Sequence, residues 1–336
     1  MRRTRLGRTE LEVSVIGFGG IPIQGVDAGE AGRVVRAALE EGITLFDSAR
    51  VYTDSEEKLG RALQGRRREV VLATKSMARD RAGMAREIET SLAALRTDCI
   101  DLYQVHNPGS EEQLTQVLAP GGALEALEAA RAQGKVRFVG LTGHSRPLLA
   151  RALGCGRFDT VQLPFSPLES EACGDVLPAA RAAGAGVLAM KPLGGGALGK
   201  LPRAALRRGL ELGVDVVLAG MDGVEQVREN AAAGRAEGPL GAAELEALEA
   251  ECARWAGEFC RRCGYCKPCP NGLDIPFLLL IEAYYTRYEL EDWARARLAA
   301  LSKRFTDCQA CGQCTERCPY SLPVPELMAR AAERVR

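Results

Sequence analysis

Between residue 13 and about residue 235, short apolar runs alternate with longer stretches in which apolar positions recur every three or four residues. Short apolar runs bounded by turn residues are typical of buried strands, and the longer period is typical of amphipathic helices. The pattern predicts eight strands: Val13–Phe18, Ile43–Asp47, Val70–Thr74, Ile100–His106, Val136–Thr142, Thr160–Leu163, Gly186–Lys191 and Val214–Gly220. Helices are predicted between them, for example at Glu30–Glu40, Ala85–Leu95, Leu124–Gln133 and Gln226–Ala233.

Eight strand–helix units predict an α/β fold, a (β/α)8 TIM barrel. A doubly wound sheet is the alternative, although it rarely carries eight such units in this length. One G-x-G-x-x-G match, Gly194 to Gly199, has Asp222 at the spacing of a ribose-binding acid. Six predicted strands precede the strand before this match, whereas the dinucleotide fingerprint normally opens its domain, so the match is weak evidence.

The two ends of the chain depart from this alternation. Residues 1–12 predict a short hairpin that caps the barrel. The pattern breaks at 237–239, and a linker helix, Ala242–Trp255, leads into a segment with further predicted helices at Pro276–Tyr288 and Asp292–Leu301. We therefore expect two domains, a barrel at 1–236 and a helical domain at 237–336.

Eight of the twelve cysteines form two short ladders near the C-terminus. Thiolates three residues apart in a loop can converge on one cubane, and a last cysteine before proline can reach a second cluster, as in two-cluster [4Fe–4S] ferredoxins. Zinc and structural disulfides are the alternatives, but zinc sites usually separate their two cysteine pairs with a longer spacer. The predicted ligands are Cys260, Cys263, Cys266 and Cys269 in the first ladder, and Cys308, Cys311, Cys314 and Cys318 in the second.

The first ladder departs from the usual spacing. Only two residues separate Cys266 from Cys269, where the second ladder has three before its last cysteine. Two clusters are expected, with one cluster as the alternative. The remaining cysteines show no ligand spacing and are expected to be small buried apolar residues: Cys99, Cys155, Cys173 and Cys252.

The charge balance indicates which partners to expect. The 44 basic and 44 acidic residues cancel, so no global field attracts nucleic acid or an anionic membrane. No apolar stretch approaches 18 residues, and no secretory segment is recognisable. We expect a cytoplasmic protein that acts on a small molecule, with neither a nucleic-acid nor a membrane partner.

Polar residues gather where successive predicted strands end, and in TIM barrels the carboxyl ends of the strands carry function. Asp47 ends the second strand with Tyr52 five residues later, Lys75 follows the third, and His106 ends the fourth. A nearby ammonium makes a phenol a better acid, and an imidazole can donate to a carbonyl oxygen. Each residue alone has an ordinary structural explanation, but together at adjacent strand ends they suit carbonyl reduction.

Three segments, Asp47–Glu56, Thr74-Lys75 and Asp101–His106, resemble those of the aldo/keto reductase family. The similarity runs from Leu6 to Asn230, about two-thirds of the chain, and the whole chain resembles the branch in which a helical iron–sulfur domain follows the barrel. The resemblance implies that Tyr52 is the proton donor, that Lys75 with Asp47 tunes it, and that His106 orients the substrate. It also implies a dinucleotide, NADP or NAD, bound by Gly19, Thr142, His144, Gln162, Met190, Lys191, Pro192, Leu193, Gly194, Gly220, Asp222, Gln226, Glu229 and Asn230.

Three of these positions differ from the family pattern. His144 stands in a stretch where many relatives have Ser-Asn, and Met190 replaces an aromatic residue that stacks on nicotinamide. Asp222 stands near the place of a Lys-Arg pair that grips the 2′-phosphate of NADP. A carboxylate repels phosphate but binds ribose hydroxyls, so NAD stays open, with Arg228 the nearby basic residue.

The leading hypothesis is an NAD(P)-dependent oxidoreductase that moves a hydride between the cofactor and a carbonyl or alcohol. Its clusters either brace the C-terminal domain or exchange electrons with a partner, and bracing is favoured because hydride carries two electrons and a cluster carries one. The alternatives are an NAD(P)H-binding redox sensor and a ferredoxin-like electron carrier with little carbonyl turnover.

Overall fold

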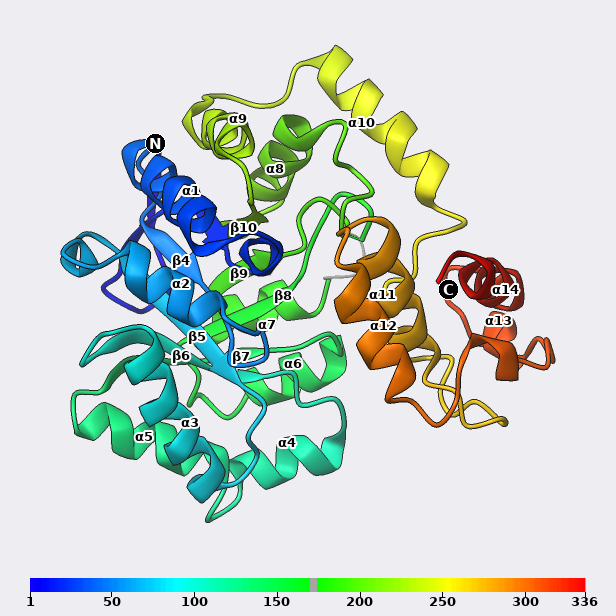
Figure 1. Cartoon of the computed structure of the whole chain (residues 1–336), viewed down its shortest axis with the longest axis horizontal. Helices are drawn as coiled ribbons and strands as arrows, with labels where there is room; N and C mark the ends of the chain where they lie inside the picture. Colours follow the sequence, from blue (N-terminus) through cyan, green and yellow to red (C-terminus); the bar gives the residue numbers. More distant parts are fainter. Residues whose placement is uncertain (170–173, 336) are drawn as a thin grey trace. The chain divides into compact units, whose positions relative to one another are not determined.

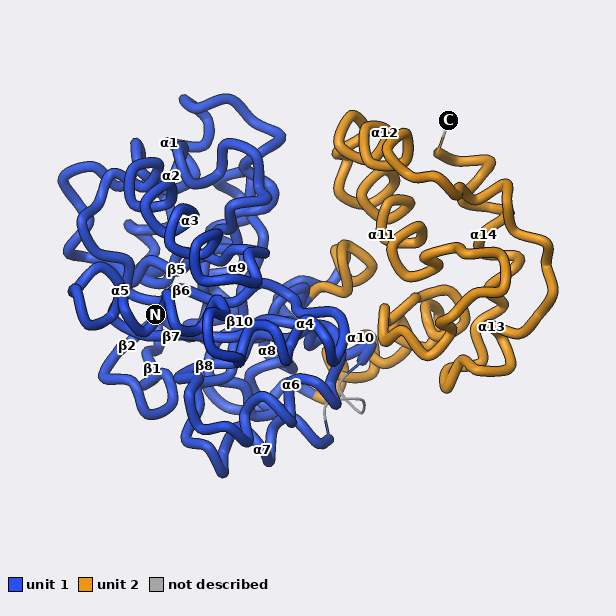
Figure 2. Tube along the Cα trace, turned by 90° about the horizontal axis from the view of Figure 1, so that it is seen from below, with its two compact units in different colours: residues 1–192, 201–241 blue, residues 193–200, 242–336 orange. Residues whose placement is uncertain are grey.

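The computed structural model of the chain describes residues 1–169 and 174–335, which form two compact units. The first unit comprises residues 1–192 and 201–241, and the second comprises 193–200 and 242–336 (Figure 2). The domain boundary expected after residue 236 stays a prediction. The loop 193–200 groups with the second unit although it follows a barrel strand in the sequence.

The first unit is a closed barrel of eight parallel strands, as the alternation of strands and helices predicts, and the doubly wound alternative is wrong. In Figure 1 the strands run side by side in the middle of this unit with helices outside them. The strand order is β10-β3-β4-β5-β6-β7-β8-β9. The barrel strands are β3 (Ile16–Gly19), β4 (Leu45–Asp47), β5 (Val71–Ser76), β6 (Ile100–His106), β7 (Val136–Thr142), β8 (Thr160–Pro164), β9 (Gly186–Met190) and β10 (Val216–Gly220).

Nine α-helices are seen among the described residues of the first unit, and several begin at side-chain caps. Asp27, Asp80 and Ser110 each accept a hydrogen bond from the backbone N–H three residues on, which satisfies a free donor of the first helical turn. The helices are α1 (Ala28–Glu40), α2 (Ser55–Ala62), α3 (Arg81–Ala94), α4 (Glu111–Leu118), α5 (Ala123–Ala132), α6 (Arg146–Leu153), α7 (Val176–Ala183), α8 (Pro202–Glu211) and α9 (Val224–Arg235).

An antiparallel hairpin of β1 (Arg3–Arg5) and β2 (Glu12–Ser14) covers the amino-terminal end of the barrel, as expected. Its buried Leu6, Leu11 and Val13 share one apolar cluster with residues from the first halves of barrel strands. This packing closes one end of the barrel, so side chains with chemical roles are confined to the carboxyl ends of the strands.

The first predicted strand, Val13–Phe18, is wrong as a single element. Residues 12–14 pair with β1, whereas 16–19 pair with β10 and β4. Val15 is the point of change: its N–H donates to Arg2 and its carbonyl accepts from Val217. The apolar run is continuous because both halves are buried, which hides the change of partner.

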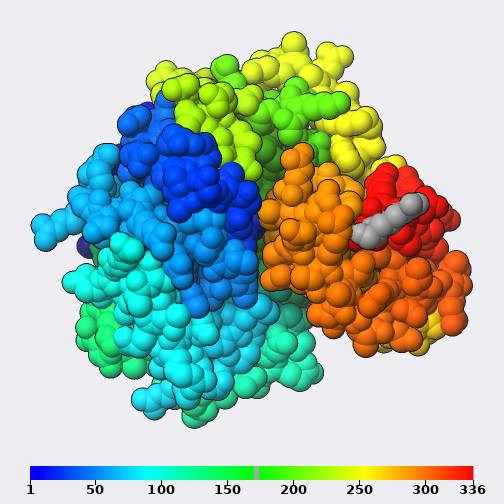
Figure 3. Space-filling model, viewed as in Figure 1, coloured from blue at the N-terminus to red at the C-terminus, as the bar shows by residue number. Residues whose placement is uncertain are grey.

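The second unit is helical, as expected, and α11 and α12 form the surface on the face shown in Figure 3 (orange). No helix in the described part of the chain is long and apolar enough to cross a membrane. The elements are α10 (Ala242–Trp255), α11 (Ile275–Thr286), α12 (Glu291–Ala299), the 3-10 turn η4 (Phe305–Asp307), α13 (Gln313–Glu316) and α14 (Val324–Arg334).

The hairpin turn gives a stability prediction. Gly7 has φ +53°, and a Cβ there would lie 2.1 Å from the backbone N of Gly186. Gly7→Ala should therefore lower the free energy of unfolding by about 2–4 kcal/mol, from left-handed strain plus overpacking. Gly65→Ala is the matched control, because Gly65 has φ +81° but open space around it. The free energy of unfolding would be measured by urea unfolding with circular dichroism. An equal loss in Gly7→Ala and Gly65→Ala would contradict this account.

Candidate active site and cysteine module

Strand register brings the predicted residues to one end of the barrel. Asp47 of β4 lies opposite Gly19 of β3, and Lys75 of β5 lies opposite Gln104 of β6. The ring continues with His106 opposite Thr142, Thr142 opposite Gln162, and Gly220 opposite Gly19. Residues far apart in the sequence therefore share the carboxyl rim of the barrel.

A buried ion pair occupies the centre of this rim. The Lys75 Nζ lies 2.5 Å from Asp47 Oδ2 and donates to the Ser48 carbonyl at 2.6 Å. Lys75 is fully buried and Asp47 is only 3% exposed. Gln104 donates to the second carboxylate oxygen at 3.2 Å, and Gln162 approaches Oδ2 at 3.5 Å. The ammonium is thus held in one place by oxygens of β4 and its following residue.

Burial and mutual attraction act in opposite directions on this pair. Loss of water lowers the pKa of Lys75 and raises the pKa of Asp47, because burial disfavours the charged form of each. The opposite charge at 2.5 Å opposes both shifts, and the two amide donors oppose the shift of Asp47, but burial remains the larger effect on each group. Removal of either partner would leave the other as an uncompensated buried charge.

Tyr52 and His106 complete the predicted group of four. The Lys75 Nζ lies 4.9 Å from the centre of the Tyr52 ring, and the Tyr52 and His106 rings meet edge to face with centroids 6.2 Å apart. The loop that carries Tyr52 is anchored at its ends: Ser48 donates to Ser55, and Ser55 donates to the Gly20 carbonyl. The structure therefore brings Asp47, Tyr52, Lys75 and His106 together.

The His106 imidazole lies in a positive environment. Its pKa is well below the ordinary value, first because the ring is buried and then because Lys75, Arg79 and Lys191 repel a proton. Its Nδ1 atom is buried and has no hydrogen-bond partner in the described structure. The ring is therefore neutral at physiological pH, a state in which it has one N–H donor.

Two supporting residues carry no sequence signal beyond their charge. Arg79, after β5, donates from Nη2 to the carbonyls of His106 and Asn107 at 2.9 and 2.8 Å and so holds the end of β6. Glu56, in α2, is 2% exposed and accepts from Thr74, Ser91 and Arg50. Their roles depend on contacts with residues distant in the sequence, which a local pattern does not reveal.

The residues expected to bind a dinucleotide lie mainly at the ends of β3, β7, β8, β9 and β10. Gln162 has a buried Oε1 with no partner in the described structure, so it offers a free acceptor. Asn230 is buried on α9, where Glu229 is exposed, and the Asp222 N–H donates to Gln226. His144 follows β7 and is half-buried, and Met190 ends β9. The free amide acceptor of Gln162 fits the carboxamide of a nicotinamide.

The glycine loop after β9 belongs to the second unit. Arg287, which follows α11, donates from Nε to the Gly195 carbonyl at 2.9 Å. Gly194, Gly195 and Gly196 all have positive φ, and a Cβ on Gly195 would lie 3.2 Å from the Tyr288 hydroxyl. The loop conformation is therefore set by glycine and by side chains of the second unit's residues 242–336, which we call the cysteine module.

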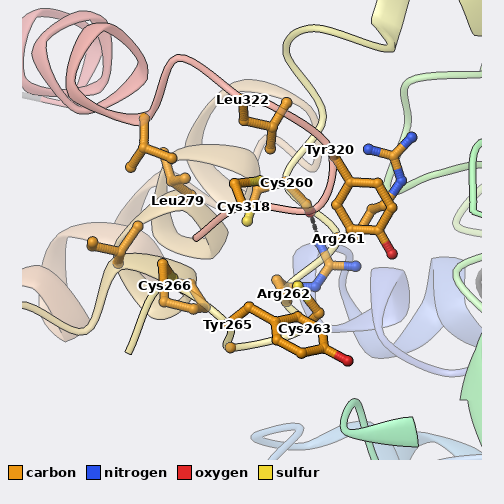
Figure 4. Close-up of a pocket in the computed structure, with 14 residues that line it drawn as sticks. Cys260, Arg261, Arg262, Cys263, Tyr265, Cys266, Leu279, Cys318, Tyr320 and Leu322 are labelled. Atoms are coloured by element: carbon orange, nitrogen blue, oxygen red, sulfur yellow. Dashed lines mark hydrogen bonds between the residues drawn. The ribbon is translucent and has the colours of Figure 1, made fainter. Parts of the chain in front are cut away.

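The last cysteine of the second ladder lies with three cysteines of the first. One pocket is lined by Cys260, Cys263, Cys266 and, from the second ladder, Cys318 (Figure 4). Cys308 and Cys311 act electrostatically on Cys314, and Arg317 donates to the Pro268 carbonyl beside Cys269. In the described residues, no three Cys, His, Asp or Glu side chains converge closely enough for a single metal ion. Four soft thiol donors around one pocket fit an iron–sulfur cluster.

The expectation that the other cysteines are buried is wrong. Cys155 is exposed just after α6, and Cys99 and Cys252 are partly exposed. Cys252 lies on α10, which buries only Leu248. A residue's hydrophobicity alone did not show which face of each segment is covered. Cys173 lies outside the described residues.

Comparison with known proteins decides the family. The model described as "Aldo/keto reductase family" matches residues 15–211, more than half of the chain. The chain belongs to the aldo/keto reductase family. A second model, "4Fe-4S dicluster domain", matches residues 259–323 and includes all eight ladder cysteines. The aldo/keto reductase barrel is therefore followed by a 4Fe-4S dicluster domain.

Individual aldo/keto reductases match the barrel. Aldo-keto reductase YhdN of Bacillus subtilis is 34% identical over 200 residues, 54% of this chain and 59% of that protein, so the match spans less than two-thirds of the relative. L-galactose dehydrogenase of Arabidopsis thaliana is 30% identical over 68% of this chain and 86% of that protein.

Solved structures of aldo/keto reductases match the fold. The holo form of AKR11C1 from Bacillus halodurans has a TM-score of 0.64 and 26% identity, over 75% of this chain and 96% of that one. An aldo-keto reductase from Klebsiella pneumoniae in complex with NADPH has a TM-score of 0.62 and 26% identity, over 74% and 94%.

The charge around His106 gives a prediction for this aldo/keto reductase. Its pKa should lie well below 6.5 in the folded chain. On acidification the unfolded chain takes up this proton first, so the stability contributed by the neutral ring falls as pH drops below about 6.5. The chain has two histidines, so nitrogen NMR of His144→Gln reports on His106 alone. A titration midpoint at or above 6.5 would contradict the charge arrangement.

Proposed function

We propose that this aldo/keto reductase interconverts a carbonyl and an alcohol, with NADPH or NADH as the partner in hydride transfer. The observation that carries the proposal is the buried Lys75–Asp47 pair under the Tyr52 ring and beside His106. Such a group supplies what carbonyl reduction needs, an acid that gives up a proton while negative charge grows on oxygen.

Each member of the group has a distinct role in this proposal. The Tyr52 hydroxyl gives its proton to the carbonyl oxygen, or takes one from the alcohol in the reverse direction. The Lys75 ammonium stabilises the phenolate that remains, and Asp47 fixes that ammonium in place. The neutral His106 ring donates a hydrogen bond that orients the carbonyl. When bound, the reduced nicotinamide supplies the hydride.

The dinucleotide contacts carried over from the family are part of the proposal. The free Oε1 of Gln162 accepts from the nicotinamide carboxamide, and backbone N–H groups of Lys191, Leu193 and Gly194 hold the pyrophosphate, with Pro192 shaping the turn between them. Thr142, His144 and Met190 line the nicotinamide, with Gly19 giving it room, and Gly220 lies at the adenosine end. Asp222, Gln226, Glu229 and Asn230 bind the adenosine end, and the carboxylate of Asp222 favours ribose hydroxyls over a 2′-phosphate.

We propose two [4Fe–4S] clusters in the dicluster domain. Cys260, Cys263, Cys266 and Cys318 hold one, supported by their shared pocket. The other is held by Cys308, Cys311 and Cys314 with Cys269, supported by the contact of Arg317 with Pro268. The clusters brace the helices of their domain, and a partner that exchanges electrons with them is the alternative role.

Tyr52→Phe tests the enzymatic proposal. The variant lacks the proton donor but keeps the ring, so kcat/KM for any carbonyl substrate should fall about 10²–10⁴-fold, while NADPH binding stays unchanged by fluorescence titration. Tyr285→Phe is the matched control, because that hydroxyl accepts from Arg295 far along the second unit. If no carbonyl or alcohol gives Tyr52-dependent turnover, the redox-sensor alternative replaces the enzyme.

The ligand exchange gives a prediction for the clusters. Chain purified without oxygen should contain roughly eight iron atoms, four for each of two clusters. Cys318→Ser should alter the same cluster as Cys260→Ser, and Cys314→Ser should alter the other. Cys155→Ser is the control, because this exposed cysteine lies outside both ladders. Iron analysis and electron paramagnetic resonance (EPR) are the measurements. Zinc in place of iron would contradict the assignment, and so would Cys318→Ser and Cys314→Ser altering the same cluster.

A further inference from the structure

The side chain of Arg262 has buried donors without acceptors. Arg262 lies between Cys260 and Cys263 and lines their pocket, beside Cys263 in Figure 4. Its Nε and Nη2 atoms are buried and have no hydrogen-bond partner in the described structure. The remaining Nη1 reaches only the Cys260 carbonyl, at 3.5 Å. A guanidinium normally uses its donors fully when buried, so this one lacks a counterpart.

The surroundings of Arg262 do not neutralise its charge. Within the described residues it makes no ion pair with a carboxylate. Its closest ring contact is Phe259, 5.8 Å away, which gives weak stabilisation. The half-buried guanidinium of Arg287 repels it, and Glu282 is shared between Arg287 and Arg334. Buried donors are normally hydrogen-bonded, so an acceptor that carries negative charge is expected next to Arg262.

The thiols of the same pocket can supply that anion. Arg262 stands between Cys260 and Cys263 in the lining of the pocket, and its Nη1 lies 3.5 Å from the Cys260 carbonyl, so its charge lies close to these thiols. Four thiolates leave an oxidised [4Fe–4S] centre with net negative charge, and one-electron reduction adds another. A fixed cation beside the centre therefore favours the reduced state more than the oxidised state, and hydrogen bonds to sulfur act in the same direction.

Among the described residues, the basic side chains close in sequence to the other cluster's proposed ligands already have partners. Lys267, two residues before Cys269, pairs with Asp274 at 3.0 Å. Arg317 is exposed and donates to the Pro268 carbonyl and to Gln313. Those donors are already used, and water screens the charge. The two predicted clusters thus sit in electrostatically different environments.

We propose that Arg262 is the counter-charge and hydrogen-bond donor of the cluster held by Cys260, Cys263, Cys266 and Cys318, and that it makes this cluster the easier of the two to reduce. The inference rests on the proposed ligand assignment but not on carbonyl turnover. It identifies this cluster as the place where an electron entering the domain resides. Arg262 is a tuning residue, since its effect acts through the cluster.

The test is an anaerobic redox titration of the full chain with its clusters, using dithionite as reductant and EPR as readout. Arg262→Gln removes the charge. At a fixed potential, the ratio of reduced to oxidised protein should fall at least tenfold for one cluster, which is a reduction potential lower by about 59 mV for one electron. Arg262→Lys keeps the charge and should shift it less. Arg295→Gln is the control for loss of one exposed positive charge on α12, and should leave both potentials unchanged.

Two results would overturn the proposal. One is an Arg262→Gln protein with full iron content and unchanged potentials. The other is loss of the same cluster from both Arg262→Gln and Arg262→Lys, which would show a structural need for the arginine shape. If Arg262→Gln loses that cluster and Arg262→Lys retains it, the need for charge is supported. The potentials are measured without a carbonyl substrate, so the outcome of this titration does not depend on whether the enzymatic proposal is correct.

Discussion

The ion pair between Lys75 and Asp47 is the constraint on which the barrel site depends. Two charges buried at 2.5 Å are stable only while both are present and their remaining hydrogen bonds are made, here by Ser48 and Gln104. The arrangement fixes an ammonium beneath the Tyr52 ring. Burial first, and then this ammonium, lower the pKa of the neighbouring His106 ring and keep it neutral. The position of the positive charge at this rim therefore follows from one buried contact.

In the cysteine module the same electrostatic reasoning leads to a different chemistry. Burial raises the pKa of the Cys266 thiol to about 12, so ligation must displace its proton. Arg262 supplies a positive charge that the protein side chains around it do not balance. The module also holds the glycine loop 193–200 through Arg287.

The repeated alternation of strands and helices was sufficient to predict the barrel, because each unit buries apolar residues in the same local pattern. The four residues of the rim were predictable because they follow consecutive strands. Glu56, Arg79 and the unbalanced charge of Arg262 were not, because their importance arises from partners distant in the sequence. The change of strand partner at Val15 and the exposure of Cys155 were hidden for the same reason.

A double-mutant cycle on the hydride-transfer step tests the central claim most directly. Single-turnover rates would be measured for the wild-type chain, Tyr52→Phe, Lys75→Met and the combined variant. If the ammonium acts through the phenol, the combined variant should be about as slow as the slower single variant. If the fold-loss of rate in the combined variant equals the product of the two single fold-losses, Lys75 and Tyr52 act independently, and the account is contradicted.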